Sequence, residues 1–343
     1  MNAKIFAVLT FFLMIIGSLS SVAITVKKEQ NDSDQKAKYQ YYVCGSIKPK
    51  DEELNLQKVV VSGDPPKEWD WRNAEYKGVT GDWTTPIRSQ GNCGSCWAFG
   101  AIAALETVYN MEKGNPNIDI DLSEQFLISC SNPLLGTFGC CGGSFNVGLS
   151  LLRSIGTINE SCFEYQAVDY RGRDADDCFF KKSNEPVKCR YKCKDWINQI
   201  IRVKDYNYPD FRRGMKNAIC TYGPLTAHMD VYEDFHEYKE GIYKHKTGNY
   251  IGGHLITIVG YNDTEKYWIC KNSWDTDWGE NGWFKIAYGE CDIESIPSYI
   301  TGIEKIKIRI FEKPNILNYI KNNEGLEKLL FKISEKSSEC IYC

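Results

Sequence analysis

The stretch QGNCGSCWAFG, residues 90–100, places two cysteines three positions apart directly before a helix-forming run. Such a pair can be a metal clip, a redox pair, a disulfide anchor or the seat of a nucleophile. From Ser95 onward, CWAFGAIAALETVYNMEKGN predicts a helix capped by Ser95 and stopped by Gly114. Cys96 would then lie at the helix N-terminus, where the backbone dipole and unpaired N–H groups favour a thiolate. Cys93 lies before the helix and is free to form a disulfide.

The other roles of this pair have weaker support. A zinc site needs a second close pair of ligands, which Cys140-Cys141 or Cys189 and Cys193 could supply. In a secreted chain, however, such pairs are more often disulfides. A thioredoxin-like redox pair is expected beside a βαβ pattern, which this sequence does not show.

The overall composition is that of an ordinary globular protein. The 343 residues include 43% hydrophobic and 25% charged side chains, with a formal net charge of −4. This charge is too small to imply a strongly charged partner, and no basic stripe interleaved with aromatic residues indicates nucleic acid binding. The 15 cysteines are the informative number, because cytosolic proteins of this size usually keep far fewer.

The N-terminus accounts for this cysteine content. One lysine, an apolar run over residues 5–16 and small residues up to Ala23 predict a secretory signal peptide over residues 1–23. An uncleaved anchor is the alternative, but the run is shorter than the roughly 20 residues of a membrane span. We therefore expect no membrane association after cleavage. Three glycosylation sequons fit this route: they begin at Asn31, Asn159 and Asn262.

The rest of the chain divides into three parts. Residues 24–64 are polar, lack a clear period and predict a short propeptide whose end the sequence leaves open. The folded domain is expected over residues 65–302, and residues 303–343 form an extension of unknown role. A helix over residues 314–333 is expected within that extension.

The expected elements indicate an α+β protein with two packed lobes, the first half helical and the second half antiparallel β. Further helices are expected from Ser123 and over residues 146–155. Strands are expected at LTAHMDV (225–231), HLITIVGY (254–261), KYWICKNSW (266–274) and GWFKIAY (282–288).

A thiolate nucleophile needs a base, and the chain has four histidines. His236 and His245 sit among charged residues and are expected at the solvated surface, whereas His228 lies in a strand-like run. His254 follows two glycines and opens an apolar strand, so its side chain can project into a cleft. Asn272 could accept a hydrogen bond from one imidazole nitrogen and orient the ring.

Three segments together resemble the signatures of papain-like cysteine proteases: QGNCGSCW (90–97), Gly252-Gly253-His254 and Asn272-Ser273-Trp274. Within that family TGNYIGGH, NSWDTDWGENGWFKI and CDIES are most similar to cathepsin B, whereas WDWRN (69–73) resembles the start of cathepsin X. The resemblance implies a papain-like fold, with a helical lobe, an antiparallel β-barrel-like lobe and a cleft between them. It implies no cofactor and no metal.

The resemblance also implies a role for each catalytic residue. Cys96 would attack the scissile carbonyl as a thiolate paired with protonated His254. Asn272 would orient His254, and Trp274 would shield that hydrogen bond from water. The Gln90 side chain and the Cys96 N–H would form the oxyanion hole.

The expected substrate-binding residues follow from the same motifs. Gly142 and Gly143 would border the cleft and let a substrate backbone approach closely. Phe145 would lie at the mouth of the S2 pocket, His228 at its wall and Ile296 at its base. Cathepsin B has an acidic residue at that base, so Ile296 predicts an apolar or aromatic substrate side chain instead.

The sequence departs from cathepsin B in a second way. No histidine occurs between Cys96 and His228, so the histidine loop with which cathepsin B holds a substrate C-terminus is missing. We therefore expect an endopeptidase. The alternatives are an exopeptidase of cathepsin B or X type and a non-catalytic papain-fold binding protein.

The expected partners are protein and peptide substrates, the enzyme's own propeptide as inhibitor, and cystatin-type inhibitors. The expected compartment is the secretory pathway, ending in the lysosome or vacuole or outside the cell.

The resemblance pairs Cys93 with Cys140 and favours Cys162 with Cys193. The remaining cysteines of the helical lobe, Cys130, Cys178 and Cys189, are also expected in disulfides, while the partner of Cys141 stays open. Cys44 in the propeptide could form a mixed disulfide with Cys96. The cysteines expected as free thiols are Cys220, Cys270 and Cys291, and those that could bridge each other or another chain are Cys340 and Cys343.

Overall fold

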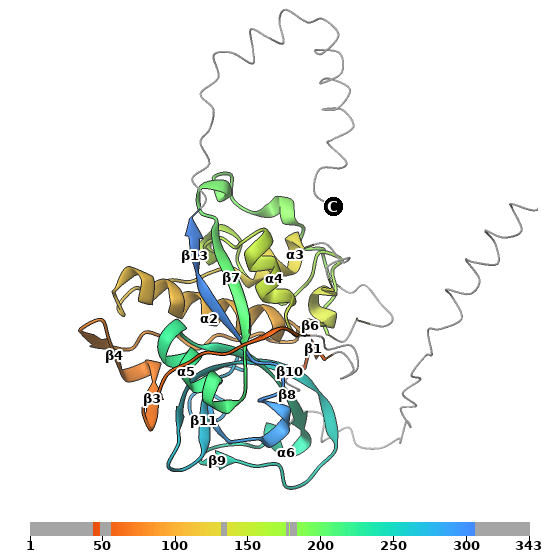
Figure 1. Cartoon of the computed structure of the whole chain (residues 1–343). Helices are drawn as coiled ribbons and strands as arrows, with labels where there is room; N and C mark the ends of the chain where they lie inside the picture. The colour runs from red at the N-terminus through yellow and green to blue at the C-terminus, as the bar shows by residue number, and fades with distance from the viewer. Residues whose placement is uncertain (1–43, 49–55, 132–135, 176–177, 179–183, 306–343) are drawn as a thin grey trace, which may run out of the picture. The chain divides into compact units, whose positions relative to one another are not determined.

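The computed structural model describes residues 44–48, 56–131, 136–175, 178 and 184–305 (Figure 1). The expected signal peptide, Asn31 and the C-terminal helix lie outside these residues. The helices are α2 (Cys96–Lys113), α3 (Glu124–Cys130), α4 (Val147–Ser154), α5 (Arg212–Tyr222) and α6 (Glu233–His236). The strands are β1 (Ser46–Ile47), β2 (Lys58–Val59), β3 (Glu68–Asp70), β4 (Ala74–Tyr76), β5 (Val79–Gly81), β6 (Gly143–Ser144), β7 (Ile201–Pro209), β8 (Leu225–Tyr232), β9 (Ile242–Tyr243), β10 (Tyr250–Asn262), β11 (Tyr267–Lys271), β12 (Trp283–Ala287) and β13 (Ser298–Lys305).

The three expected helices are confirmed with their caps. Ser95 is the N-cap of α2, and Gly114 ends it at φ 62°, a left-handed conformation that glycine adopts without strain. At the start of α3 the Ser123 hydroxyl accepts a hydrogen bond from the Phe126 N–H at 3.0 Å. The helix α4 follows at the expected place. In the described residues no helix has the length and apolar character of a membrane span.

The strands form a nine-stranded sheet in the order β2-β7-β13-β8-β10-β11-β12-β9, with β3 paired to β10. Most pairs are antiparallel, but β2 pairs with β7 and β12 with β9 in parallel. The sheet is therefore mixed, and along its described strands it does not close into a barrel. All four expected strands are present, whereas β7, β13 and the helix α5 were not expected.

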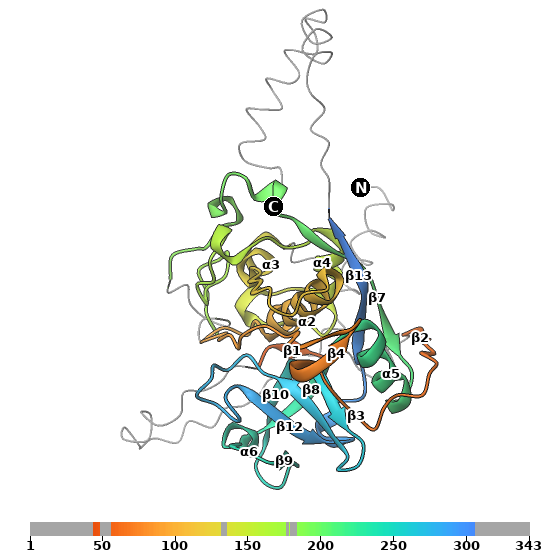
Figure 2. The same cartoon turned by 90° about the vertical axis from the view of Figure 1, so that its left-hand side faces the viewer.

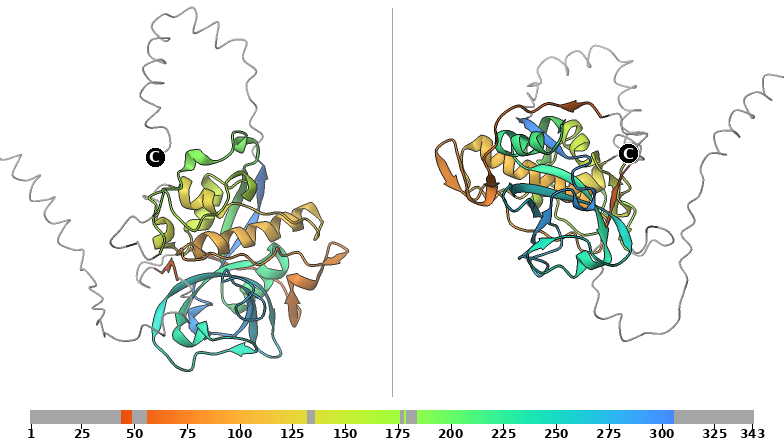
Figure 3. Two further views of the ribbon diagram at one scale, coloured as in Figure 1. Left: turned by 180° about the vertical axis from the view of Figure 1, so that it is seen from behind. Right: turned by 60° about the horizontal axis from the view of Figure 1, so that its bottom comes forward.

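Two hydrophobic cores correspond to the two expected lobes. The first gathers residues of α2, α3 and α4, and the second gathers residues of β8, β10, β11 and β12. Figure 2 shows α2, α3 and α4 grouped on one side and β8, β10 and β12 on the other, and the view from behind in Figure 3 shows α2 lying between the two groups.

The helix α2 packs closely on β10. Gly100 in α2 leaves room for Leu255, since a Cβ added there would lie 3.3 Å from its side chain. The Thr257 hydroxyl donates to the Gly100 carbonyl at 2.9 Å. This close approach brings the N-terminus of α2 next to the strand that carries His254.

Four disulfides lie between residues 93 and 193, all in the helical lobe. The pairs Cys93–Cys140 and Cys162–Cys193 are confirmed, and the open partners resolve as Cys130–Cys189 and Cys141–Cys178. The cysteines offered as a second zinc pair are thus all oxidised and unavailable as thiolate ligands. The free thiols among the described cysteines are Cys44, Cys96, Cys220, Cys270 and Cys291.

Removing the longest of these bridges is expected to destabilise the protein without changing its chemistry. Cys130 and Cys189 are 59 residues apart in the sequence. Replacing both by serine should lower the free energy of unfolding by about 2–4 kcal/mol, because the unfolded chain regains the freedom that the bridge removes. Urea unfolding measures the change. Cys220→Ser is the control, since that thiol is free, and an equal loss there would contradict the interpretation.

Candidate active site

Cys96 is the first residue of α2 and is completely buried. Burial raises the pKa of its thiol to about 11, although backbone hydrogen bonds from Leu255, Gly45 and Trp97 act in the opposite direction. The effect of desolvation on the thiol pKa is therefore larger than that of these hydrogen bonds. In this structure Cys96 is a neutral thiol at physiological pH.

His254 lies near the start of the long strand β10 and is also completely buried. Its Nε2 lies 2.8 Å from the Asn272 Oδ1, and its ring stacks on Trp274 with centroids 4.7 Å apart. Burial lowers the pKa of His254 to about 4, while the hydrogen bond to Asn272 raises it in part. The imidazole is therefore neutral. Because an amide oxygen only accepts, Nε2 carries the proton and Nδ1 is the basic nitrogen.

Gln90 and the Asn272 loop are held together by two hydrogen bonds. The Ser273 hydroxyl donates to the Gln90 Oε1 at 2.7 Å, and the Gln90 N–H donates to the Ser273 carbonyl at 2.9 Å. The Gln90 Nε2 donates to the Cys93 carbonyl at 2.8 Å, just before Cys96. The expected oxyanion-hole side chain is thus fixed between the Asn272 loop and the segment that precedes Cys96.

A segment of the expected propeptide covers Cys96. The strand β1 pairs in parallel with β6, so that Ser46 lies opposite Gly143. The Gly143 N–H donates to the Gly45 carbonyl at 2.8 Å, and the Phe145 N–H donates to the Ile47 carbonyl at 3.1 Å. Residues 44–48 therefore occupy the glycine-bordered edge where a substrate backbone was expected.

The close approach of this segment depends on glycines from both sides. A Cβ on Gly45 would lie 2.0 Å from the Gly94 carbonyl oxygen, and one on Gly142 would lie 2.7 Å from the Gly45 oxygen. Gly142 also has φ 106°, which larger residues rarely adopt. These positions allow two backbones to touch next to Cys96.

The residues expected around the S2 pocket do come together. Phe145, Leu255 and Ile296 form one buried apolar cluster with Cys96, which we call the Cys96 cluster. Leu56 of the expected propeptide packs against it, as does Tyr208. His228, only 1% exposed, places its Nδ1 2.9 Å from the Ser46 hydroxyl.

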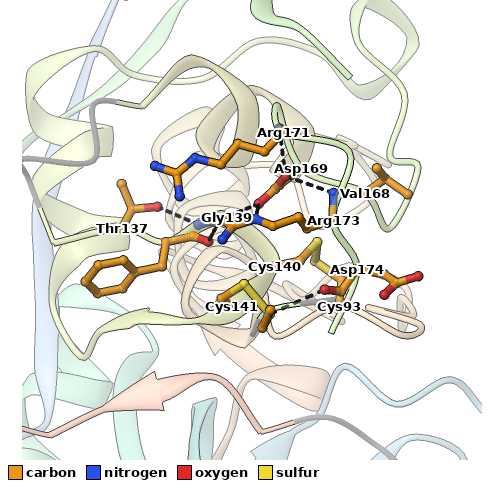
Figure 4. A network of polar contacts seen from close by, with 12 residues as sticks. Cys93, Thr137, Gly139, Cys140, Cys141, Val168, Asp169, Arg171, Arg173 and Asp174 are labelled. Carbon is orange, nitrogen blue, oxygen red and sulfur yellow. Dashed lines mark hydrogen bonds and ion pairs between the residues drawn. A yellow bond between two sulfur atoms is a disulfide. The ribbon is translucent and has the colours of Figure 1, made fainter. Parts of the chain in front are cut away.

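A polar network supports the loop that carries Gly142. Asp169, which is fully buried, accepts hydrogen bonds from the Arg171 and Arg173 N–H groups at 2.7 and 3.1 Å and pairs with the Arg173 guanidinium at 2.9 Å. The same guanidinium donates to the Phe138 carbonyl at 3.1 Å. Figure 4 shows this network beside Cys93, Cys140 and Cys141, of which the first two are bonded to each other and the third to Cys178. The loop is therefore fixed by covalent bonds and by a buried ion pair.

Two histidines differ from the sequence-based expectation of a solvated position. His236 is half-buried and stacks on Trp274 with ring centroids 5.2 Å apart, on the residue that also stacks on His254. His245 stacks on Tyr232, and its Nδ1 lies 3.0 Å from the Asp234 carboxylate. The charged residues next to these histidines in the sequence indicated an exposed position. The contacts with Trp274 and Tyr232 could not be predicted, because only the folded chain brings those rings next to the histidines.

Tyr165 is a further residue that no motif indicated. Its hydroxyl donates to the Gln90 carbonyl at 2.7 Å and lies 2.7 Å from the Ser95 hydroxyl. It thereby connects the Gln90 segment to the cap of α2.

Cys44 lies close to the site but is not bonded to it. Both Cys44 and Cys96 are free thiols, so the mixed disulfide considered from the sequence is not formed. Burial, and to a smaller extent the proximity of the second ionisable thiol, Cys96, raises the pKa of Cys44. A Cβ on Gly252 would lie 2.8 Å from the Cys44 Cβ, which places Cys44 two residues from His254 along β10.

Sequence comparisons agree with this geometry. A family model described as papain family cysteine protease matches residues 65–301. Cathepsin B-like CP1 of Giardia intestinalis is 36% identical over 263 residues, which cover 73% of this chain and 77% of that protein. Cathepsin B-like protease 1 of Arabidopsis thaliana is 34% identical, over 63% of this chain and 57% of that protein.

Solved structures show the same fold. The proCathepsin B S9 from Trypanosoma congolense superposes with a TM-score of 0.60 at 24% identity, over 77% of this chain and 87% of that one. The digestive procathepsin L 3 of Tenebrio molitor gives a TM-score of 0.54 at 29% identity, over 72% and 74% of the two chains.

Proposed function

Because the chain belongs to the papain family of cysteine proteases, we propose that it is an endopeptidase made as an inactive precursor, with Cys96 as nucleophile. The observation that carries this proposal is that Cys96 at the start of α2 and His254 on β10, oriented by Asn272, are both completely buried, with α2 packed on β10. A binding protein without activity would have no need to keep these three side chains in this arrangement.

The reaction follows from the chemistry of these groups. Nδ1 of His254 takes the proton of Cys96, and the thiolate attacks the scissile carbonyl carbon to form a tetrahedral intermediate. The Cys96 N–H and the Gln90 amide stabilise its oxyanion. The intermediate collapses as His254 gives its proton to the leaving amine, which leaves an acyl-enzyme. His254 then deprotonates a water that hydrolyses the thioester and restores Cys96.

The preference for internal bonds is proposed from the composition of the chain. A carboxypeptidase must bind the charged C-terminus of its substrate, and cathepsin B does so with two loop histidines. This chain has no histidine between Cys96 and His228. The uncompensated cost of burying a carboxylate then disfavours cleavage next to a C-terminus.

Residues 24–64 are proposed as the inhibitory propeptide. Support comes from the backbone pairing of β1 with β6, the hydrogen bond from Gly45 to Cys96 and the packing of Leu56 on the Cys96 cluster. While this segment is bound, no substrate carbonyl can reach the sulfur.

Gly45→Ala in the precursor is expected to weaken this inhibition. The new methyl group would lie 2.0 Å from the Gly94 carbonyl oxygen, so the segment must move away from Cys96. Overpacking of this kind costs about 1–3 kcal/mol, and labelling of Cys96 in the uncut precursor by a thiol-reactive peptide should rise about tenfold or more. Lys58→Ala, an exposed change in the same segment, is the control. Equal labelling in both variants would contradict the inhibitory role.

A secretory route ending in the lysosome, vacuole or extracellular space is also proposed. It rests on the predicted signal peptide over residues 1–23 and on the four disulfides, because such bonds persist in oxidising compartments. The exposed sequon at Asn159 is an expected glycosylation site on that route.

The proposal is tested with the processed protein and its Cys96→Ala variant on fluorogenic peptides. The peptides carry Phe, Leu or Arg before a cleaved Arg, either internally or near a free C-terminus. We expect internal cleavage of the Phe and Leu peptides, and none by the variant. Release of C-terminal dipeptides would indicate an exopeptidase, and no cleavage by correctly processed protein would indicate a binding protein.

A further inference from the structure

His228 faces the Cys96 cluster from β8. In the antiparallel pair of β8 and β10, His228 lies directly opposite Leu255. Side chains opposite each other in such a pair lie on the same face of the sheet. Leu255 belongs to the Cys96 cluster with Phe145 and Ile296, so the imidazole is a polar group at the wall of an apolar site.

The surroundings of the ring indicate which of its nitrogens accepts. Nε2 lies 3.5 Å from the Asp230 carboxylate, and Nδ1 lies 2.9 Å from the Ser46 hydroxyl. Nε2 has no hydrogen-bond partner among the described residues, but the negative charge of the nearby Asp230 carboxylate favours the tautomer with the proton on that nitrogen. Nδ1 is then an acceptor, and the Ser46 hydroxyl donates to it.

Ser46 holds this position as part of the covering segment. Its neighbours Gly45 and Ile47 are hydrogen-bonded through their carbonyls to Gly143 and Phe145, as a bound peptide backbone would be. Its hydroxyl is therefore directed to His228 from the position of a ligand side chain. The ring has little freedom to turn elsewhere, because a Cβ on Gly253 would lie 2.4 Å from the His228 Cε1.

Removal of the propeptide takes this partner away. Nδ1 of His228 is then a buried acceptor at the wall of the emptied pocket, and a buried polar group without a partner is unfavourable. A substrate side chain that brings a hydrogen-bond donor on an apolar frame would restore the contact and fill the cluster around Ile296.

We propose that His228 makes the S2 pocket select substrates whose P2 side chain, the second before the cleaved bond, carries a hydroxyl on an apolar frame. Threonine is then preferred over valine, and tyrosine over phenylalanine. This inference rests on the proposed function and refines its substrate class: the pocket remains apolar at Ile296, and His228 adds one directional contact.

The test compares isosteric peptides cleaved by the processed enzyme. Two pairs differ only at P2, Thr against Val and Tyr against Phe, and kcat/KM is measured for each. One hydrogen bond to a buried acceptor predicts a ratio of about 5 to 30 in favour of the hydroxyl. In His228→Leu the ratio should fall below 1, because the hydroxyl is then buried without a partner. His228→Asn, which keeps a polar atom near the place of Nδ1, should restore part of the preference.

Controls separate this inference from the function on which it rests. His245→Leu changes a histidine outside the Cys96 cluster and should leave both ratios as in the wild type. Active-site titration with a thiol reagent confirms that each variant is folded. Equal cleavage of Thr and Val peptides by active wild-type enzyme would overturn the role of His228 alone. If titratable enzyme cleaves none of the four peptides, the proposed function and this inference are both overturned.

Discussion

Replacing His254 by alanine in the processed enzyme should lower kcat/KM by about 10⁴-fold or more, about as much as replacing Cys96. Without the imidazole, no neighbouring group takes the thiol proton or protonates the leaving amine. Because we propose that the two side chains act as one unit, the Cys96→Ala/His254→Ala double variant should be no slower than either single variant.

The double variant distinguishes a nucleophile–base pair from two residues that act independently. Losses that multiplied would mean that Cys96 and His254 act independently, which contradicts a nucleophile–base pair. A residual activity within 100-fold of the wild type in His254→Ala would point to a different base. His236 is the candidate to test in that case, since it also stacks on Trp274. Trp274→Phe would then alter the residual activity.

The reactivity of Cys96 towards iodoacetamide at pH 6 should rise by about 10³-fold or more when the propeptide is removed. In the covered state the pKa of Cys96 is about 11 and that of His254 about 4, so between these values the pair is a neutral thiol and a neutral imidazole. Admission of water lowers the first pKa and raises the second, because both shifts are dominated by burial. The thiolate–imidazolium pair then becomes accessible.

Peptide mapping of the alkylated protein measures this change site by site. Cys270, whose thiol pKa is raised by burial in the sheet core, is the internal control and should stay unreactive in both forms. Above pH 11 the precursor should lose its protection, since the thiol then ionises even when covered. Equal rates at pH 6 before and after processing would show that the covering segment does not control the charge of Cys96.

The parts of the site that could be predicted from sequence are those with a local signal. The cap at Ser95, the stop at Gly114 and the small residues of α2 define the helix that carries Cys96. Two glycines before an apolar strand define the place of His254. The choice of a base for Cys96 is then narrow, because a histidine is needed and the chain has only four.

The parts that were missed depend on contacts between distant segments. The parallel register of Ser46 with Gly143 joins residues almost a hundred positions apart and leaves no periodic pattern. The pairs Cys130–Cys189 and Cys141–Cys178 are two of many combinations that spacing allows.

The helix α5 is a different case, because its sequence does contain apolar residues at helical spacing. Met215, Ala218 and Ile219 are buried at helical spacing, but the surrounding β-like runs favoured a strand interpretation of the whole region.

The uneven placement of the disulfides sets limits on the redox conditions in which such an enzyme works. Every bridge described lies in the half that carries Cys96, whereas the half with His254 holds only free thiols among its described cysteines. Oxidants inactivate the nucleophile, so some reductant is needed. Strong reductants are expected to open the bridges of the half that carries Cys96, while the sheet that carries His254 has no described disulfide to lose. Strong oxidants and strong reductants are therefore both expected to inactivate the enzyme, the first by oxidising Cys96 and the second by opening the disulfides of the helical lobe.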